Sequence, residues 1–497
     1  LLPQPVAALY EDYREPKNVV LSSLFGGISH IKGAFEVAVI LRSRGHNITY
    51  ITSDNQVKLA KPYAFPTISI GLTSFEADMR GKGTMGISFF AYIKEKIIDA
   101  SYEHDYLRYK EIFAEIKPDI VVCDIFATAC VDASFMAGIP FAILEMMILS
   151  SDAPAPYINS MLSTEPTSMH QTLLQRIDTN FIQIAKILYC MYPGMVALNK
   201  KRARVGVPPV WGMDSRWRDS YISIQTPRPL GPLVHVIGPV MARRLRRIRT
   251  KCLARLALPQ RPSHCARLFA PSRRDLIWAI VQTQSTEFPA TILVPNGDPI
   301  AAASLTANEH PDFHFTTWAP QFAVLNHTST RLFISHSGAE SAHEALYTGT
   351  PLLLQPYFGD QPANTAKLVS AGVALRINPH SLTVTEVADS IRCLVEDASG
   401  QFAVNIKRMK ALAQIGSHRV ARGADVLEEV MFGSVNRNKS IHLYSPDKEM
   451  TWYKAGNYDL YFVVVVGLGG LVYGVGKVMM FAVKNVVNRG IVKVKQA

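Results

Sequence analysis

Cysteine is scarce in this sequence, with 6 residues in 497. No two cysteines form a C-x-x-C pair, so the chain has neither a disulfide scaffold nor the ligand spacing of a zinc site, and we expect no bound metal. Charged residues are also sparse, at 19% against 48% hydrophobic residues, which excludes a disordered or fibrous chain. The length is sufficient for at least two hydrophobic cores.

Acidic residues are absent between residues 243 and 274. Ten arginines and one lysine lie there, so this block carries 11 of the 12 net positive charges and the rest of the chain is nearly neutral. Such a block could bind nucleic acid or anionic lipid. It lacks a regular interleaving of aromatic residues that would stack on bases, so we expect no nucleic-acid partner.

The two ends of the chain bear on its relation to membranes. The sequence begins without an initiator methionine, which indicates either a removed signal peptide or an incomplete N-terminus. Residues 460–483 contain one charged residue, Lys477, and at about 1.5 Å per residue they are long enough to cross a bilayer as a helix. A buried core helix or a pair of strands is the alternative. We predict a transmembrane helix over 460–483.

The flanks of this segment predict its orientation. Aromatic residues, including Trp452 and Tyr458, lie in the preceding juxtamembrane stretch, 446–459. Only basic charges follow, in the tail formed by residues 484–497. The positive-inside rule then places the tail in the cytosol and the main body on the other side of the membrane.

The remaining sequence shows two series of alternating strand and helix patterns. In the first, apolar runs at 18–24, 47–53, 119–126 and 139–144 read as buried strands, with a helix over 33–44. In the second, apolar runs at 331–336, 351–356 and 372–377 alternate with helices, the last a long one over 401–432. This pattern predicts two facing Rossmann-like α/β domains, 1–241 and 290–445, separated by an atypical segment, 242–289.

The densest motif runs from Trp318 to Gln361, over 44 residues. A strand ending at His336 turns at Gly338 into a helix that contains Ser341 and Glu344, and backbone N–H groups at such a helix start suit a phosphate. Taken singly, these residues have ordinary structural roles, such as a core position for Trp318 or a helix cap for Asp360. Their joint spacing is what indicates a function.

The full motif resembles the nucleotide-sugar signature of the UDP-glycosyltransferases, the family 1 glycosyltransferases. The resemblance implies the GT-B fold and a UDP-sugar as co-substrate, with no other cofactor. It also implies roles for individual residues: Trp318 stacks on uracil and Gln321 borders the nucleoside. His336, Gly338 and Ser341 hold the diphosphate, Glu344 binds the ribose, and Asp360 and Gln361 bind the sugar hydroxyls.

The N-terminal half resembles the same family. His30 follows the first strand, where the family keeps its catalytic base, and Asp124 matches the acid that orients this histidine. An acceptor hydroxyl is a poor nucleophile until a base takes its proton. A carboxylate on the other imidazole nitrogen would fix the tautomer and stabilise the imidazolium. The C-terminal region resembles the membrane-anchored branch, which implies a single-pass protein of the endoplasmic reticulum with lumenal catalytic domains.

Two departures from the family matter. Glu340 stands beside the expected diphosphate, where relatives have an amide or a small residue, and a carboxylate there would repel phosphate by about 1–4 kcal/mol unless it turns away or is neutralised. In addition, the segment 242–289 replaces the expected first strand and Gly-Ser loop of the second domain. It is either a natural insertion or a translated intron or frameshift, and we favour the second interpretation because local and global signals conflict only there.

The sequence as a whole predicts a membrane-anchored hexosyltransferase. It would transfer glucose or glucuronate from a UDP-sugar to a hydroxyl of a small lipophilic acceptor with inversion, using His30 and Asp124. One alternative is an inactive membrane-anchored relative that only binds a lipophile or nucleotide. The other is a protein that binds nucleic acid or anionic lipid through residues 243–274.

Overall fold

The computed structural model describes residues 14–71, 87–144, 168–212, 216, 221–224, 234–236, 240–241, 276–279, 290–292, 298–310, 313–316, 319–357, 360–379, 381–433 and 450–494. The chain divides into two compact units, Leu1–Ser440 and Ile441–Ala497. The first contains the α/β part of the chain and the second the C-terminal helices.

The N-terminal half of the first unit is built on a seven-stranded sheet in the order β3-β2-β1-β4-β5-β6-β7, with all neighbours parallel. Its strands are β1 (Asn18–Ser23), β2 (Asn47–Thr52), β3 (Thr67–Ser69), β4 (Ile120–Asp124), β5 (Phe141–Leu144), β6 (Tyr221–Ile224) and β7 (Val234–Val236). β1 and β4 are almost wholly buried, as their continuous apolar runs predict for strands covered on both faces. The strand order changes direction between them, and ligands of such sheets bind at this point.

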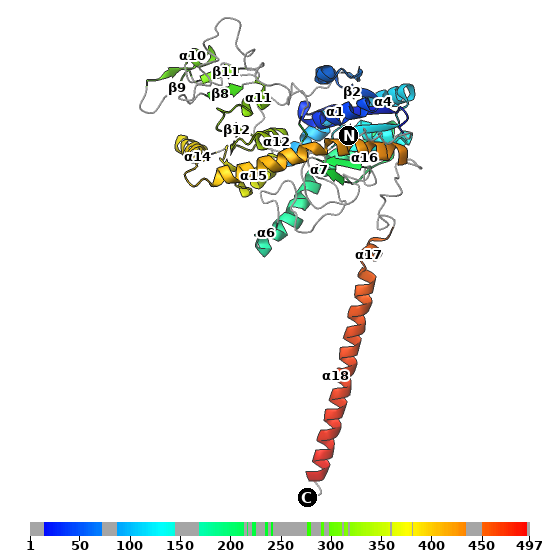
Figure 1. Cartoon of the computed structure of the whole chain (residues 1–497). Helices are drawn as coiled ribbons and strands as arrows, with labels where there is room; N and C mark the ends of the chain where they lie inside the picture. The colour runs from blue at the N-terminus through cyan, green and yellow to red at the C-terminus, as the bar shows by residue number, and fades with distance from the viewer. Residues whose placement is uncertain are drawn as a thin grey trace, which may run out of the picture. The chain divides into compact units, whose positions relative to one another are not determined.

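Helices and short helical turns connect these strands (Figure 1). They are α1 (Ile28–Ser43), a 3₁₀ helix (Asp54–Tyr63), α3 (Ile87–Ile93), a π turn (Lys94–Ile98), α4 (Tyr102–Ile116), α5 (Thr128–Ala137), α6 (Leu173–Ile177), a second π turn (Asp178–Ile182) and α7 (Gln183–Arg204). The first helix begins five residues before the predicted start at 33. Gly26 and Gly27, with φ of 89° and 69°, turn the chain sharply from β1, so His30 lies in the first turn of α1.

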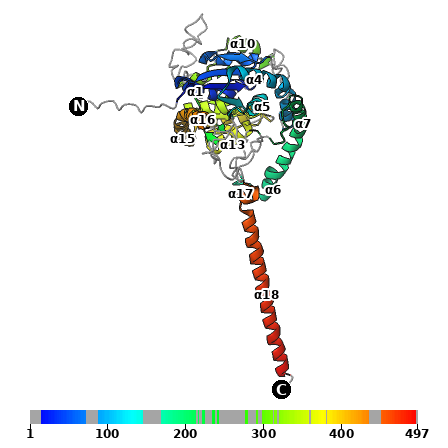
Figure 2. The same ribbon diagram turned by 90° about the vertical axis from the view of Figure 1, so that its right-hand side faces the viewer.

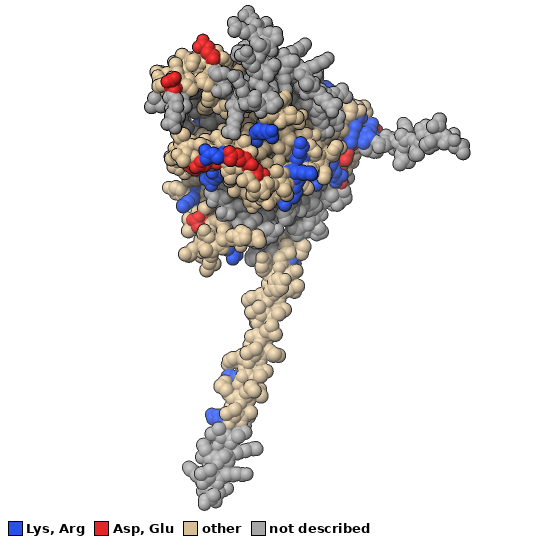
Figure 3. All heavy atoms as spheres, turned by 60° about the vertical axis from the view of Figure 1, so that its left-hand side comes forward, with Lys and Arg blue, Asp and Glu red and all other residues tan. Residues whose placement is uncertain are grey.

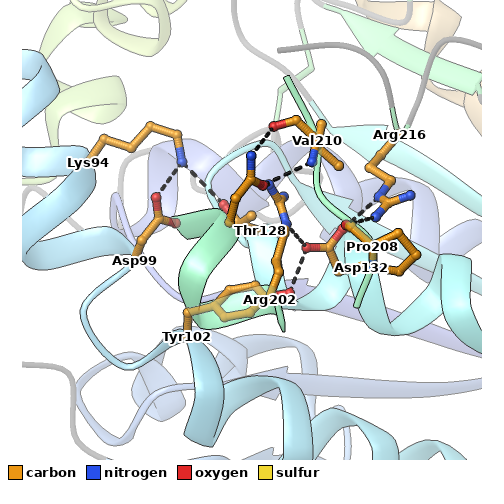
Figure 4. A network of polar contacts seen from close by, with 10 residues as sticks. Lys94, Asp99, Tyr102, Thr128, Asp132, Arg202, Pro208, Val210 and Arg216 are labelled. Atoms are coloured by element: carbon orange, nitrogen blue, oxygen red, sulfur yellow. Dashed lines mark hydrogen bonds and ion pairs between the residues drawn. The ribbon is translucent and has the colours of Figure 1, made fainter. Parts of the chain in front are cut away.

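A buried ionic network joins α4, α5 and α7 (Figure 4). Asp132 on α5 is fully buried and accepts hydrogen bonds from Arg202 Nε at 2.7 Å and Arg216 Nε at 3.0 Å. Tyr102 on α4 donates its hydroxyl to the same carboxylate at 2.7 Å. Two guanidinium groups and a hydroxyl therefore compensate the desolvation of one carboxylate.

The C-terminal half of the first unit carries its strands in smaller sheets. Parallel strands β12 (Phe333–Ser335), β13 (Leu352–Leu354) and β14 (Ala374–Arg376) form one sheet, β8 (Leu276–Ala279) pairs in parallel with β11 (Phe313–Thr316), and β9 (Thr291–Ile292) pairs with β10 (Ile300–Ala301) in antiparallel fashion. The helices are α10 (Ala302–Thr306), α11 (Gln321–Leu325), α12 (Ala339–Thr348), α13 (Gln361–Ser370), α14 (Val384–Glu396), α15 (Gln401–Gly416) and α16 (Val420–Gly433).

Strand β8 was not expected from the sequence, because it lies inside the segment 242–289 to which no strand was assigned. Its four residues hydrogen-bond along β11, from Leu276 opposite Phe313 to Ala279 opposite Thr316. The rest of that segment, 242–275 and 280–289, lies outside the described residues, as does the arginine-rich block.

The long helix predicted over 401–432 is in fact two helices. A 3₁₀ turn, Ser417–Arg419, separates α15 from α16. Helix α16 packs along α1 of the N-terminal half (Figure 1), and Glu428 on α16 accepts a 2.6 Å hydrogen bond from Arg44 Nη1 and lies 3.0 Å from His46 Nε2. The chain thus returns to the N-terminal sheet after it has built the second half.

The second unit contains α17 (Trp452–Ala455) and α18 (Tyr458–Val494). Residues Tyr458–Lys484 form a 27-residue candidate membrane span with a mean hydropathy of 1.9 and no burial within the protein. Figure 3 shows this helix with an almost wholly uncharged surface. The segment is helical, so the alternative of a strand pair is excluded.

A second stretch passes the same test of length and composition, and the sequence did not suggest it. It is Leu173–Arg204, which comprises α6, the π turn and α7, with a mean hydropathy of 1.4 and 11% of its apolar window buried. Figure 2 shows its N-terminal part, α6, extending away from the sheet.

Candidate functional site

The structure places His30 and Asp124 together at the carboxyl ends of β1 and β4. His30 Nδ1 lies 2.9 Å from Asp124 Oδ2, and the aspartate is buried with 1% exposure. The other carboxylate oxygen, Oδ1, accepts a 3.0 Å hydrogen bond from the Phe126 backbone N–H. Asp124 is therefore held from two sides, and it orients the imidazole through Nδ1.

Small and aromatic residues shape the surroundings of His30. A Cβ atom at Gly26 would lie 2.0 Å from His30 Cδ2, and the φ of 89° at this position also favours glycine. The rings of Phe25 and Phe126 lie 6.0 and 5.4 Å from the imidazole, centroid to centroid. These contacts confine the histidine to one orientation, and the sequence analysis did not single out Gly26 for this role.

The electrostatic setting raises the pKa of His30 above its ordinary value of 6.5. Burial alone would lower this pKa, but the charge and hydrogen bond of Asp124 outweigh burial, and the charge of Asp360 adds to the same effect. Asp360 belongs to the C-terminal half, at the N-cap of α13. The histidine is thus influenced by carboxylates from both halves of the first unit.

A disulfide joins Cys123 at the end of β4 to Cys130 in α5. It closes the short loop that contains Asp124. No cysteine motif in the sequence indicated this bond, because its two partners are brought together only by the turn from β4 into α5.

The turn between β12 and α12 contains His336, Ser337 and Gly338. Ser337 is fully buried with φ of 69°, a strained backbone for a residue with a side chain. A Cβ atom on Gly338 would lie 2.5 Å from His336 Nε2, so the imidazole folds back over this glycine. Burial lowers the pKa of His336, which keeps the ring neutral at physiological pH, although the charge of Asp360 opposes this shift.

Asp360, the N-cap of α13, also contacts the start of α12, and its charge acts on His30. Its carboxylate accepts hydrogen bonds from Asn364 Nδ2 at 2.6 Å and from the backbone of Ala339, the first residue of α12. Burial raises the pKa of Asp360, and these hydrogen bonds together with His336 counteract the rise. Asp360, His336 and His30, which are far apart in the sequence, therefore lie in one electrostatic neighbourhood.

Gln321, Ser341 and Glu344 form a second group on α11 and α12. Gln321 Nε2 donates to Glu344 Oε2 at 2.9 Å and lies 3.3 Å from Ser341 Oγ. The other oxygen of Glu344, Oε1, accepts a hydrogen bond from Lys32 Nζ at 3.1 Å. Both carboxylate oxygens of the expected ribose ligand are thus engaged by side chains of the protein.

Glu340 forms an ion pair with the same lysine, Lys32. Of the two ways in which a carboxylate at this position could be tolerated, turning away or neutralisation, the structure shows a cation from α1 paired with it. Lys32 itself was not singled out, and the only signal in the sequence was the unusual acid at position 340.

Two predicted residues complete the motif. Gln361 is buried at the start of α13, and its Oε1 accepts a 2.8 Å hydrogen bond from the Tyr357 backbone. Trp318, the expected uracil-stacking residue, lies outside the described residues.

Among the side chains that the structure describes, no three of the types His, Cys, Asp and Glu are grouped as a metal would require.

Known proteins of similar sequence are glycosyltransferases. The UDP-glucoronosyl and UDP-glucosyl transferase family matches residues 298–493. A UDP-glycosyltransferase of Talaromyces amestolkiae is 28% identical over 86% of this chain and 91% of its own length. The human UDP-glucuronosyltransferase 1A1 is 24% identical over 66% of this chain and 60% of its own length.

Solved structures show the fold. The glycotransferase of kitacinnamycin superposes with a TM-score of 0.57 at 17% identity, over 84% of this chain and all of its own. CalG4, the calicheamicin glycosyltransferase, superposes with a TM-score of 0.55 at 15% identity, over 84% of this chain and 99% of its own. The chain thus has the GT-B fold that was predicted from its sequence. The family model and the curated relatives support the family inferred from the sequence, the family 1 UDP-glycosyltransferases.

Proposed function

We propose that this protein transfers a hexose, glucose or glucuronate, from a UDP-sugar to a hydroxyl of a small lipophilic acceptor, with inversion at the anomeric carbon. The observation that carries the proposal is the His30–Asp124 pair at 2.9 Å, with Asp360 of the donor motif acting on the same imidazole. A base and a donor-binding residue from different halves of the chain act at one place, as group transfer requires.

In the proposed reaction, the acceptor hydroxyl gives its proton to His30 Nε2 while Asp124 holds Nδ1. The acceptor oxygen forms a bond to the anomeric carbon, the bond from that carbon to the phosphate oxygen breaks, and UDP leaves with the electron pair. Asp124 stabilises the imidazolium that results.

The proposed donor site uses the residues of the family motif. Trp318 and Gln321 hold the nucleoside, Glu344 the ribose, and His336, Gly338 and Ser341 the diphosphate. Asp360 and Gln361 bind the sugar hydroxyls. The N-terminus of α12 supports the diphosphate assignment, because its N-cap, Gly338, offers no side chain that would occupy the helix start.

The test is single-turnover transfer from radiolabelled UDP-glucose and UDP-glucuronate to a panel of hydrophobic alcohols. We expect transfer by the wild-type protein and a loss of about 100- to 10,000-fold in His30→Ala, the usual contribution of a general base. Transfer that survives His30→Ala unchanged would contradict the mechanism.

A second candidate function is that of an inactive relative that binds a nucleotide or lipophile. It is favoured by Glu340 beside the proposed diphosphate site and by the segment 242–289, whose sequence departs from the strand and Gly-Ser loop expected of the family, although strand β8 lies within it. UDP binding without transfer to any acceptor of the panel would support this alternative.

We further propose that the protein is anchored by Tyr458–Lys484 in the membrane of the endoplasmic reticulum, with its catalytic halves in the lumen. The unburied apolar helix supports the anchor. The Cys123–Cys130 disulfide supports the lumenal side, because disulfides persist in oxidising compartments.

A further inference from the structure

Lys32 is a buried cation that the mechanism above does not use. It lies on α1, two residues after His30, and its side chain is 7% exposed. Its ammonium pairs with Glu340 and, at 3.1 Å, with Glu344, which both lie on α12. A single lysine thus connects α1, which carries the proposed base in its first turn, to α12, the helix of the proposed donor site.

The charged groups that influence Lys32 and Glu340 are acids, and no second cation is among them in the described part of the chain. Glu36 on α1 adds negative charge near Glu340, while His343 on α12 stays neutral because burial lowers its pKa to about 4, an effect that Lys32 reinforces. Glu340 Oε2 is buried and has no hydrogen-bond partner among the described residues. Without Lys32, Glu340 would be an uncompensated buried carboxylate.

Glu340 lies in the first turn of α12, where the helix dipole favours one negative charge. A diphosphate bound at the same helix start would meet this carboxylate at short range, and like charges in a site of low dielectric repel strongly. The two can coexist when a cation balances the carboxylate, and Lys32 is placed to do this.

We propose that Lys32 is a positioning residue of the donor site, which neutralises Glu340 so that α12 accepts the diphosphate of a UDP-sugar. The inference rests on the proposed function and deepens it. Lys32 acts through Glu340 and does not itself contact the donor. Its pairing also holds α12 against the helix that carries His30, so donor binding and the position of the base are linked.

The experiment is calorimetric titration of UDP into the full-length protein in detergent micelles. The variants are Lys32→Met, Glu340→Gln and the double variant that carries both changes. We expect Lys32→Met to weaken UDP binding by about 10- to 100-fold, because it leaves the Glu340 charge unbalanced. In the double variant, binding returns to within about threefold of Glu340→Gln alone, because the charge at position 340 is gone and Glu344 keeps its hydrogen bond from Gln321.

Arg44→Met is the matched control. Arg44 is also a partly buried cation that joins α1 to the C-terminal half, through Glu428 and Asp425, but it lies at the opposite end of the helix. This variant should bind UDP as the wild type does. Thermal unfolding checks each variant, and where Lys32→Met does not fold, the comparison of Glu340→Gln with the double variant carries the test.

The kinetic readout is the KM for the UDP-sugar, which should rise in Lys32→Met while the KM for the acceptor stays constant. A double variant at least about tenfold weaker than Glu340→Gln would overturn the inference, since Lys32 would then act through Glu344 or on the donor itself. Wild-type binding in Lys32→Met would also overturn it. A wild-type protein that binds no UDP would refute the proposed function and this inference together.

Discussion

At the scale of single residues, the proposed chemistry depends on the protonation state of one imidazole. His30 must be neutral at Nε2 to accept a proton, and Asp124 both orients the ring and raises its pKa. The same carboxylate therefore orients the base and also stabilises its protonated form, which cannot accept a proton from the acceptor. Enzymes balance these effects near the pH at which they work.

This balance predicts the pH dependence of transfer. Because the pKa of His30 is raised above 6.5, the protonated and inactive form persists above that pH, and kcat/KM should rise with pH through a midpoint above 6.5. Asp124→Asn removes the charge that raises the pKa, so the midpoint should move to lower pH while kcat falls. A pH profile of kcat/KM measures both effects, and an unchanged midpoint in Asp124→Asn would contradict the pairing.

A second prediction concerns Gly338. An added methyl group in Gly338→Ala would lie 2.5 Å from His336 Nε2 and must displace the imidazole. Since His336 is a proposed diphosphate ligand, UDP affinity should fall by about tenfold, the loss of one hydrogen bond to a charged group, with little change in Tm. Gly194→Ala in α7 is the control, because its methyl group would meet only the Glu95 side chain at ordinary contact distance. Equal affinity in both variants would argue against the role of His336.

At the scale of elements, the N-terminal half depends on a polar connection as well as on its apolar core. Asp132 lies on α5, the helix that directly follows the Asp124 loop, and it is paired with arginines from α7 and from the segment beyond it (Figure 4). This network fixes α5, and with it the loop that positions Asp124.

Removal of the charge at Asp132 should therefore destabilise the fold strongly. Asp132→Asn leaves two buried guanidinium groups with a weaker partner, and we expect a loss of about 3–5 kcal/mol in the free energy of unfolding. Chemical denaturation measures this loss. Asp389→Asn is the matched control, because Asp389 pairs with Arg392 on an exposed helix surface, and its stability should equal that of the wild type. A mild effect at Asp132 would show that packing alone holds α5.

At the scale of the whole molecule, the two compact units suggest separable roles in catalysis and anchoring. Deletion of residues 450–497 removes α17 and α18. We expect carbonate extraction to release the remaining protein from the membrane fraction, and we expect this protein to retain transfer activity. Deletion of 485–497 alone keeps the candidate span and should leave the protein in the membrane. If the variant that lacks residues 450–497 stays in the membrane fraction, this would indicate that Leu173–Arg204, the other apolar helical stretch, also binds lipid.

Much of the fold follows from local pattern. Continuous apolar runs identified β1, β4, β12 and β13, and the Gly-containing turns between strand and helix located His30 and His336 at strand ends. These features are predictable because a buried parallel strand needs apolar residues on both faces. The candidate membrane span was visible for a similar reason, since hydrocarbon excludes charge over a fixed length.

Other features depend on contacts that no local pattern encodes. Strand β8 is defined by its pairing with β11. The paired residues Leu276 and Phe313 are 37 positions apart in the sequence. The break between α15 and α16 became apparent only from the return of α16 to α1. The Cys123–Cys130 bond likewise depends on a turn that brings two unremarkable cysteines together.

The family was thus readable from residue order, and the proposed donor motif and base were inferred in the same way, because each rests on neighbours in sequence or on a short repeatable spacing. The tertiary structure decided how the unusual Glu340 is tolerated. Its counter-charge, Lys32, lies 308 positions away, and only the fold brings the side chains of α1 and α12 close enough for the two to pair. A buried charge is stabilised by whichever cation the fold places beside it, and sequence distance has no influence on that energy.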